Sequence, residues 1–196
     1  FSAIDYRSHR DRYRRFRRIS PSCELYAGNS RDSALAWPFV ATPEIGHPAP
    51  DFTLPGITLV EGEPVKSHFT LSGRRGRPVV LAFYPADNSP GCTAQLCSYQ
   101  DEMDVFRNLG ADIWGISRQA TGTHEKFALS KHLGFPLLAD EKGDVVNAYG
   151  VGLLGLGVRR SIFIIDTDGR LAWKHVALVG VTFQSADTLK RELLKL

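Results

Sequence analysis

Cysteine is scarce in this sequence, and long apolar runs are missing from it. Only three cysteines occur among 196 residues, which is too few for a disulfide scaffold. The longest apolar stretches, such as "VVLAF" and "IFII", are strand-sized, whereas a membrane-spanning helix needs about 20 apolar residues. Hydrophobic residues still make up 43% of the chain, enough for one core. We therefore expect one globular domain outside the membrane, with cysteines that serve chemistry.

Most of the chain also lacks a strong charge of either sign. The formal net charge is +3, and residues 1–42 hold eight arginines and four acidic residues, while residues 43–196 hold 16 basic and 17 acidic residues. A nearly neutral body gives no reason to expect a polyanionic partner. We expect residues 43–196 to form the domain and residues 1–42 to be an Arg-rich extension.

The Arg-rich stretch at residues 7–18 has three interpretations. Its arginines alternate with Tyr13 and Phe16, which could stack on bases while the guanidinium groups neutralise phosphates. A solvated, disordered tail is the preferred interpretation. A transit segment for a plastid or mitochondrion is the third, although Asp5 and Asp11 weaken that match. We expect a cytoplasmic protein, with an organelle as the alternative, and no nucleic-acid partner.

Strand-like and helix-like patterns alternate along residues 43–196. Apolar runs predict strands at 51–59 (or a hairpin there), 77–84, 111–117, 159–166 and 170–178. Helices are predicted at 93–109, 123–134, 144–150 and 185–196, the last with Ser185 as N-cap. This alternation predicts an α/β fold, with a central mixed sheet flanked by helices on both faces.

The stretch "SPGCTAQLC" places Cys92 at the start of a helix. The unpaired N–H groups and the partial positive charge of a helix N-terminus favour a thiolate there. Pro90 and Gly91 shape the tight turn into the helix, and the Ser89 hydroxyl, three residues before Cys92, could hydrogen-bond the sulfur or a bound oxygen atom. A small buried hydrophobe is the alternative role for Cys92, but the local sequence is a turn.

Cys97 lies too far along the same predicted helix to bond with Cys92. Five residues of α-helix separate two Cα atoms by roughly 8 to 9 Å, and a disulfide needs less than about 7 Å. If both cysteines are helical when reduced, the first turn or two of the helix must unwind before they can bond. A plain helix residue remains the alternative for Cys97.

The stretch "FYPADNSPGCTAQLCSYQDEMDVF" resembles the active-site segment of the peroxiredoxin Q family, also called bacterioferritin comigratory protein. The general peroxiredoxin signature Pro-x-x-x-Thr/Ser-x-x-Cys is met by Pro85, Ser89 and Cys92. The later stretches "HEKFALSKHLGFPLLADEKGDVVNAYGV" and "RRSIFIIDTDG" are also similar to family segments. The resemblance covers about residues 43–196 and implies a thioredoxin-like fold.

The resemblance also implies a function and a set of site residues. Cys92 would attack a hydroperoxide and become a sulfenic acid, and Cys97 would condense with it to a disulfide. Thioredoxin or a similar dithiol would reduce that bond, and neither a metal nor another cofactor would take part. Arg160 matches the family arginine that steadies charge on the breaking O–O bond. A bridge within one helix requires no second subunit, so we expect a monomer.

Arg160 is preferred over its neighbour Arg159 because of strand alternation. Arg160 shares a face of its predicted strand with Ile162 and Ile164, while Arg159 points to the opposite face. Ser89 stands where the family more often has Thr, which keeps the hydroxyl. Gln100 stands where members of the family often have Arg, which puts only local contacts of the helix in doubt.

Two other functions remain open. A thioredoxin-like disulfide oxidoreductase typically uses Cys-x-x-Cys, whereas this chain has four residues between its cysteines. A redox-sensing binding protein would act through residues 1–42. Cys23 lies outside the resemblance. We expect it to have no role, and a disulfide with a second chain is the weaker alternative.

Histidines and glycines add no further site. Three histidines lie on different predicted elements without zinc-ligand spacing and are interpreted as surface or core residues, namely His124, His132 and His175. The glycine-rich stretch at residues 150–158 lacks the Gly-Lys-Ser/Thr ending of a phosphate loop. We expect it to be a flexible loop ahead of Arg160.

Overall fold

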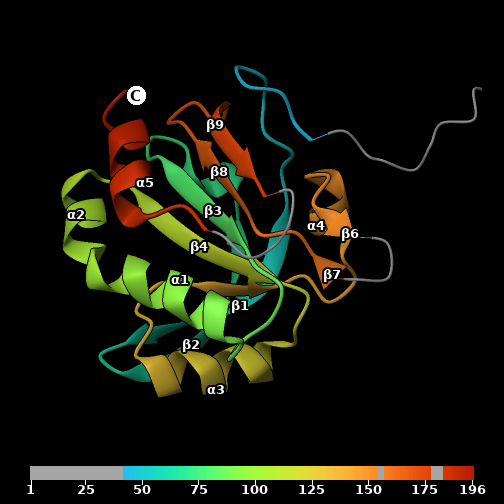
Figure 1. The fold of residues 1–196 in the computed structure, drawn as a ribbon, viewed down its shortest axis with the longest axis vertical. Helices are drawn as coiled ribbons and strands as arrows, with labels where there is room; N and C mark the ends of the chain where they lie inside the picture. The colour runs from blue at the N-terminus through green and yellow to red at the C-terminus, as the bar shows by residue number, and fades with distance from the viewer. Residues whose placement is uncertain (1–41, 154–156, 178–182) are drawn as a thin grey trace, which may run out of the picture. The chain divides into compact units, whose positions relative to one another are not determined.

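The computed structural model describes residues 42–153, 157–177 and 183–196 (Figure 1). At its centre is a seven-stranded sheet in the order β2-β1-β5-β4-β3-β8-β9. The strands are β1 (Thr53–Val60), β2 (Glu63–Thr70), β3 (Val79–Phe83), β4 (Asp112–Ser117), β5 (Leu137–Ala139), β8 (Ser161–Ile165) and β9 (Leu171–Val176). β4 pairs in parallel with β3 and β5, and the other pairs are antiparallel. The predicted mixed sheet is confirmed.

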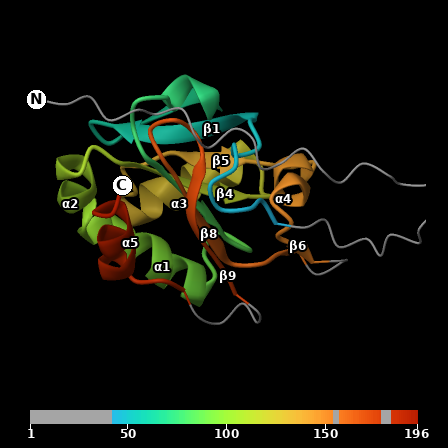
Figure 2. The same cartoon turned by 90° about the horizontal axis from the view of Figure 1, so that it is seen from above.

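Helices cover both faces of the sheet, as expected. Along β3, Val80 and Ala82 point to a core that includes α1 (Pro90–Asp101), α2 (Met103–Asn108), α3 (Thr121–Lys131) and α5 (Ala186–Leu193). The intervening Val79 and Leu81 point to a second core that includes α4 (Asp144–Ala148). In Figure 2, α1 and α5 lie together on one side of the sheet. The two-residue alternation of β3 therefore builds both cores.

The helix predicted at 93–109 is two helices. α1 begins earlier, at Pro90, and the chain leaves helical geometry at Glu102, where φ is −104° and ψ is 15°. α2 begins at the next residue, and its Met103 and Phe106 side chains pack in the same core as Leu96 and Tyr99 of α1. The apolar spacing runs on across the break because both helices pack on one core, so the periodicity did not reveal it.

Three short strands escaped the sequence prediction. β5 is only three residues long, and its place between β1 and β4 depends on pairing with distant residues. Within the expected loop at 150–158, β6 (Gly152–Leu153) and β7 (Gly157–Val158) form a two-stranded antiparallel ribbon. The described part of this stretch, which was expected to be a loop ahead of Arg160, therefore contains a short ribbon.

The remaining expectations agree closely with the structure or lie beyond it. The segment predicted as a strand or a hairpin, 51–59, contains the single strand β1, and its hairpin partner β2 was not predicted. Ser185 caps α5 by accepting a hydrogen bond from the Thr188 N–H. Across the described ranges, no helix is long and apolar enough to cross a membrane. The extension expected at residues 1–42, including Cys23, lies outside the described residues apart from Thr42.

Candidate active site

A short turn connects the end of β3 to the start of α1 and positions Cys92. Ser89 has extended geometry (φ −69°, ψ 141°) and precedes the first helical residue, Pro90, which needs no donor at that position. The Thr93 N–H makes the first helical hydrogen bond, to the Ser89 carbonyl oxygen at 2.9 Å. Cys92 is therefore the third residue of α1, and its exposed fraction is 0%. Its expected place at a helix start is confirmed.

Arg160 reaches this turn from the neighbouring strand. Phe83, the last residue of β3, pairs with Ser161, the first residue of β8, and these strands run antiparallel. Arg160 immediately precedes β8, so its backbone lies at the same end of the sheet as the turn into α1. Ile162 and Ile164 face the same core as Cys92, in agreement with the predicted face of the strand.

The Arg160 guanidinium contacts the sulfur of Cys92 directly. Its Nη2 donates to Cys92 Sγ at 3.4 Å, and its Nη1 donates to the Gly91 carbonyl oxygen at 3.1 Å and to Gln95 Oε1. Only 4% of Arg160 is exposed. A Cβ atom at Gly91 would lie 3.1 Å from Nη2, so glycine leaves room for the guanidinium. A fixed cation and the first turn of a helix thus meet at one thiol.

Pro85 and Ser89 lie in the turn that precedes Cys92, as their sequence positions require. Both are half-buried. The Ser89 hydroxyl donates to the Ala86 carbonyl oxygen at 3.2 Å, which makes it a bond within the turn. The structure therefore brings Arg160 onto the sulfur and gives the Ser89 hydroxyl a partner other than the sulfur.

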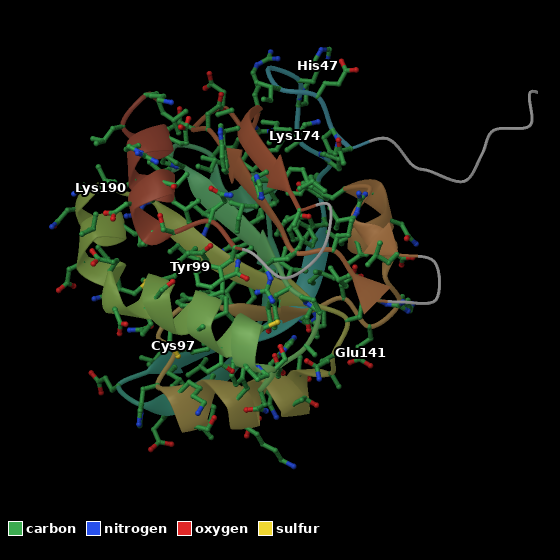
Figure 3. The ribbon with its side chains drawn as sticks, viewed as in Figure 1. His47, Cys97, Tyr99, Glu141, Lys174 and Lys190 are labelled. Carbon is green, nitrogen blue, oxygen red and sulfur yellow. The ribbon has the colours of Figure 1, made fainter. Side chains whose placement is uncertain are left out.

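Cys97 lies in the same unbroken helix as Cys92, and both thiols are free. It is half-buried and packs against the core that contains Cys92, on the side of α1 that faces α3 (Figure 3). Burial raises the pKa of the Cys97 thiol, and the Asp101 carboxylate raises it further, while Lys131 opposes them. Cys97 is therefore held as a neutral thiol in the folded helix.

Gln95 and Tyr99 form a polar chain that the sequence reasoning missed. Gln95 accepts from Arg160, and its Nε2 donates to Tyr99 Oη at 3.2 Å. Tyr99 Oη donates to the Gln184 carbonyl oxygen at 2.7 Å, in the segment that leads into α5 (Figure 3). Burial raises the pKa of Tyr99 far above its usual value. The helical spacing of Cys92, Gln95 and Tyr99 was the signal that could have revealed this chain.

A second buried polar cluster lies behind the turn. Tyr84 Oη donates to Asp87 Oδ1 at 2.7 Å, and His124 Nδ1 lies 2.8 Å from Asp87 Oδ2. The Asp87 and His124 side chains are fully buried. Burial raises the pKa of Tyr84 well above its usual value, and Asp87 adds to the effect. His124 is thus a core histidine, one of the two roles expected for it.

The structure also contains a cavity away from Cys92. It has a volume of about 560 Å³ and lies between β1, β5 and α4, with Asp51, Glu141 and Tyr149 in its lining. Its lining residues include none of the predicted site residues Pro85, Ser89, Cys92 and Arg160. The cavity is therefore separate from the candidate active site.

Comparisons with known proteins agree with this geometry. The model of the AhpC/TSA family matches residues 45–174. Peroxiredoxin Bcp of Bacillus subtilis is 37% identical over 158 residues, which cover 76% of this chain and 96% of that protein. Peroxiredoxin Q, chloroplastic, of Sedum lineare is 40% identical over 126 residues, covering 63% of this chain and 64% of that protein.

A solved structure supports the fold as well. Peroxidoxin BcpB of Mycobacterium tuberculosis superposes with a TM-score of 0.65 at 32% identity, and the match covers 79% of this chain and 98% of that one. This likeness confirms the expected thioredoxin-like arrangement.

Proposed function

The chain belongs to the AhpC/TSA family as a peroxiredoxin, a thiol-dependent peroxidase, and on that premise we propose that Cys92 is the thiol that attacks the hydroperoxide. The contact between Arg160 and the Cys92 sulfur, 3.4 Å long, is the observation that carries this proposal. Cys92 also lies in the first turn of α1, where backbone N–H groups favour negative charge.

The first step transfers one oxygen atom to the sulfur. The Cys92 thiolate attacks one oxygen of the hydroperoxide, an S–O bond forms, and the O–O bond breaks. The sulfur is oxidised to a sulfenic acid, and the departing oxygen leaves as water or an alcohol after it takes up a proton. The Arg160 guanidinium stabilises the negative charge that develops across the breaking bond.

Cys97 completes the oxidation in a second step. Its sulfur attacks the sulfenic acid at Cys92, an S–S bond forms, and water leaves. In intact α1 the two Cα atoms are roughly 8 to 9 Å apart, beyond the reach of about 7 Å for a disulfide. We therefore propose that the first part of α1 unwinds before the bond forms.

Unwinding of α1 would break specific contacts that hold the reduced helix. These are the bonds from Arg160 to Gln95 and from Tyr99 to the Gln184 carbonyl oxygen. The Gln100 side chain also accepts from the Gly134 N–H at 2.7 Å. Each links α1 to a segment outside it, so the helix can open as far as one of these residues only if that residue's contact breaks.

A dithiol reductant would close the cycle. Reduction of the Cys92–Cys97 disulfide by thioredoxin or a similar dithiol returns both thiols by thiol–disulfide exchange. The bridge lies within one chain and needs no thiol from a second copy. We accordingly propose a functional monomer with a hydroperoxide substrate and a dithiol partner.

Turnover with a coupled reductant tests the proposal. NADPH consumption is followed with hydrogen peroxide, thioredoxin and thioredoxin reductase for the wild type, Cys92→Ser and Cys97→Ser. We expect Cys92→Ser to abolish turnover, and Cys97→Ser to consume one equivalent of peroxide without recycling. Unimpaired turnover by Cys92→Ser would overturn the mechanism. Intact mass after stoichiometric peroxide should show the loss of two hydrogens in the wild type, whereas a dimer on a non-reducing gel would indicate Cys23.

The cellular compartment is a separate question, governed by residues 1–42. The relative from Sedum lineare is named chloroplastic, which supports an organelle as the alternative to the cytoplasm. Imaging of a tagged full chain beside one that lacks residues 1–42 distinguishes the two. Loss of an organellar signal on truncation would identify a transit segment.

A further inference from the structure

The fully buried side chains of Asp87 and His124 meet in a contact of 2.8 Å that the proposed reaction does not use. We propose that His124 is a positioning residue, which holds the turn at residues 85–89 through Asp87 so that Cys92 meets the Arg160 guanidinium in the reactive geometry. This inference rests on the proposed role of Cys92. It adds a residue from α3, distant in sequence, to the machinery of the site.

Both carboxylate oxygens of Asp87 and its backbone N–H have partners in other segments. Its Oδ1 accepts from Tyr84 Oη at 2.7 Å, and its Oδ2 lies 2.8 Å from His124 Nδ1. Its backbone N–H donates to Gln119 Oε1. These contacts tie the turn to the end of β3, to α3 and to Gln119, which lies two residues after β4.

The surroundings of His124 determine what its ring contributes. Its Nε2 lies 3.2 Å from the Leu138 carbonyl oxygen, which can only accept, so Nε2 carries a hydrogen. Its Nδ1 lies within hydrogen-bond distance of the Asp87 carboxylate, at 2.8 Å from Oδ2. The ring therefore bridges the turn to β5, and loss of the ring would leave a buried carboxylate oxygen without this partner.

The backbone of the turn also passes through a left-handed conformation. Asn88, directly after Asp87, has a φ of 60°, in the left-handed region that non-glycine residues adopt at some energetic cost. Such a conformation persists where the surrounding structure fixes it. Ser89 and Pro90 follow at once, so the position of Asp87 determines where α1 begins.

The contact between Cys92 and Arg160 depends on where α1 begins. Arg160 is placed by β8 and its pairing with β3, whereas Cys92 is placed by the turn and the first residues of α1. A shift of the turn therefore moves the sulfur relative to the guanidinium without moving the sheet. Displacements of about 1 Å at reacting groups can lower rates by up to about 10²-fold.

The test compares two reactions of Cys92 in the full chain with Cys97→Ser as background. One is the second-order rate with hydrogen peroxide, and the other is the rate with iodoacetamide, each read at Cys92 by peptide mass. Alkylation needs a thiolate and access to it, whereas peroxide reduction also needs the aligned guanidinium. The ratio of the two rates, per folded molecule, therefore reports positioning.

His124→Leu should lower the ratio of peroxide to alkylation rate by about tenfold or more. His124→Asn, whose amide can donate to Asp87, should restore most of it. The matched control is His68→Leu, at an exposed position of β2, which should leave the ratio unchanged. An unchanged ratio in folded His124→Leu, including equal falls in both rates, would overturn the inference.

If His124→Leu does not fold, Tyr84→Phe tests the inference in its place. It removes only the hydroxyl that donates to Asp87 and should lower the ratio in the same direction, by a smaller factor. A ratio equal to that of the background protein would overturn the inference. If the background protein itself does not reduce peroxide, it is the proposed function that fails, because the inference concerns only the effect of the variants on that reaction.

Discussion

The Arg160 guanidinium lies 3.4 Å from the Cys92 sulfur, although the two residues are 68 positions apart in the chain. Antiparallel pairing of β3 with β8 brings them to the same end of the sheet. Gln95, one turn into α1, accepts from the same guanidinium. The cation is thus fixed before any peroxide arrives, which is the arrangement that stabilises a developing charge most effectively.

Replacement of Arg160 should slow the first chemical step. Arg160→Met keeps much of the side-chain volume and removes the charge, so the rate with hydrogen peroxide should fall by about 10²- to 10³-fold. Stopped-flow measurement on the reduced protein gives this rate. The neighbouring Arg159→Met serves as control, because the Arg159 guanidinium donates to the Gly150 carbonyl oxygen and not to Cys92, and its rate should stay within about twofold. Equal losses in both variants would contradict a specific role for Arg160.

A methyl group at Gly91 should disturb the same contact. The added Cβ would lie 3.1 Å from Arg160 Nη2, so the guanidinium must shift in Gly91→Ala. We expect a peroxide rate several-fold lower, by about 1 kcal/mol of lost stabilisation. Gly122→Ala in α3 is the matched control, because an added Cβ there meets nothing within 4 Å. A wild-type rate in Gly91→Ala would show that the guanidinium position is not limiting.

Removal of the Tyr99 hydroxyl should loosen α1. Tyr99→Phe deletes the bond to the Gln184 carbonyl oxygen and leaves that acceptor without this donor, at a cost of about 1 to 3 kcal/mol. Urea unfolding should show the lower stability. Because the proposed mechanism has α1 unwind before the disulfide forms, oxidised Cys92 should also be resolved by Cys97 faster than in the wild type. A disulfide that forms more slowly would argue against helix opening as the limiting event.

The reactivity of Cys97 should depend on pH differently in the folded and unfolded protein. Burial raises its pKa in the folded state, so the neutral thiol is favoured there and the thiolate appears only at higher pH. Alkylation of Cys97 should therefore rise at a higher pH in native protein than in urea-unfolded protein. The stability that this thiol contributes is fully present below its unfolded pKa and is lost as the pH rises through its folded pKa. Coincident pH profiles would contradict the effect.

Several features of the fold were predictable because they depend on near neighbours in sequence. The turn residues Pro90 and Gly91 place Cys92 at a helix start, and the apolar run that contains β3 predicts a strand covered on both faces. Strand alternation also selects the face that carries Ile162 and Ile164. These follow from backbone geometry and side-chain periodicity, which act within a few residues.

The remaining features required contacts between distant segments. The break at Glu102 is invisible to periodicity because α1 and α2 share one core, and β5 is too short to show a pattern. His124 lies on α3, and only the packing of that helix brings its ring to Asp87, in the turn that precedes Cys92.

The sequence by itself thus determined a cysteine at the start of a helix and a second cysteine beyond its reach. Only the tertiary structure decided which charged and polar groups surround them. The reason is physical: local preferences act along the chain, whereas the partners of Cys92 and Asp87 are set by strand pairing and by helix packing.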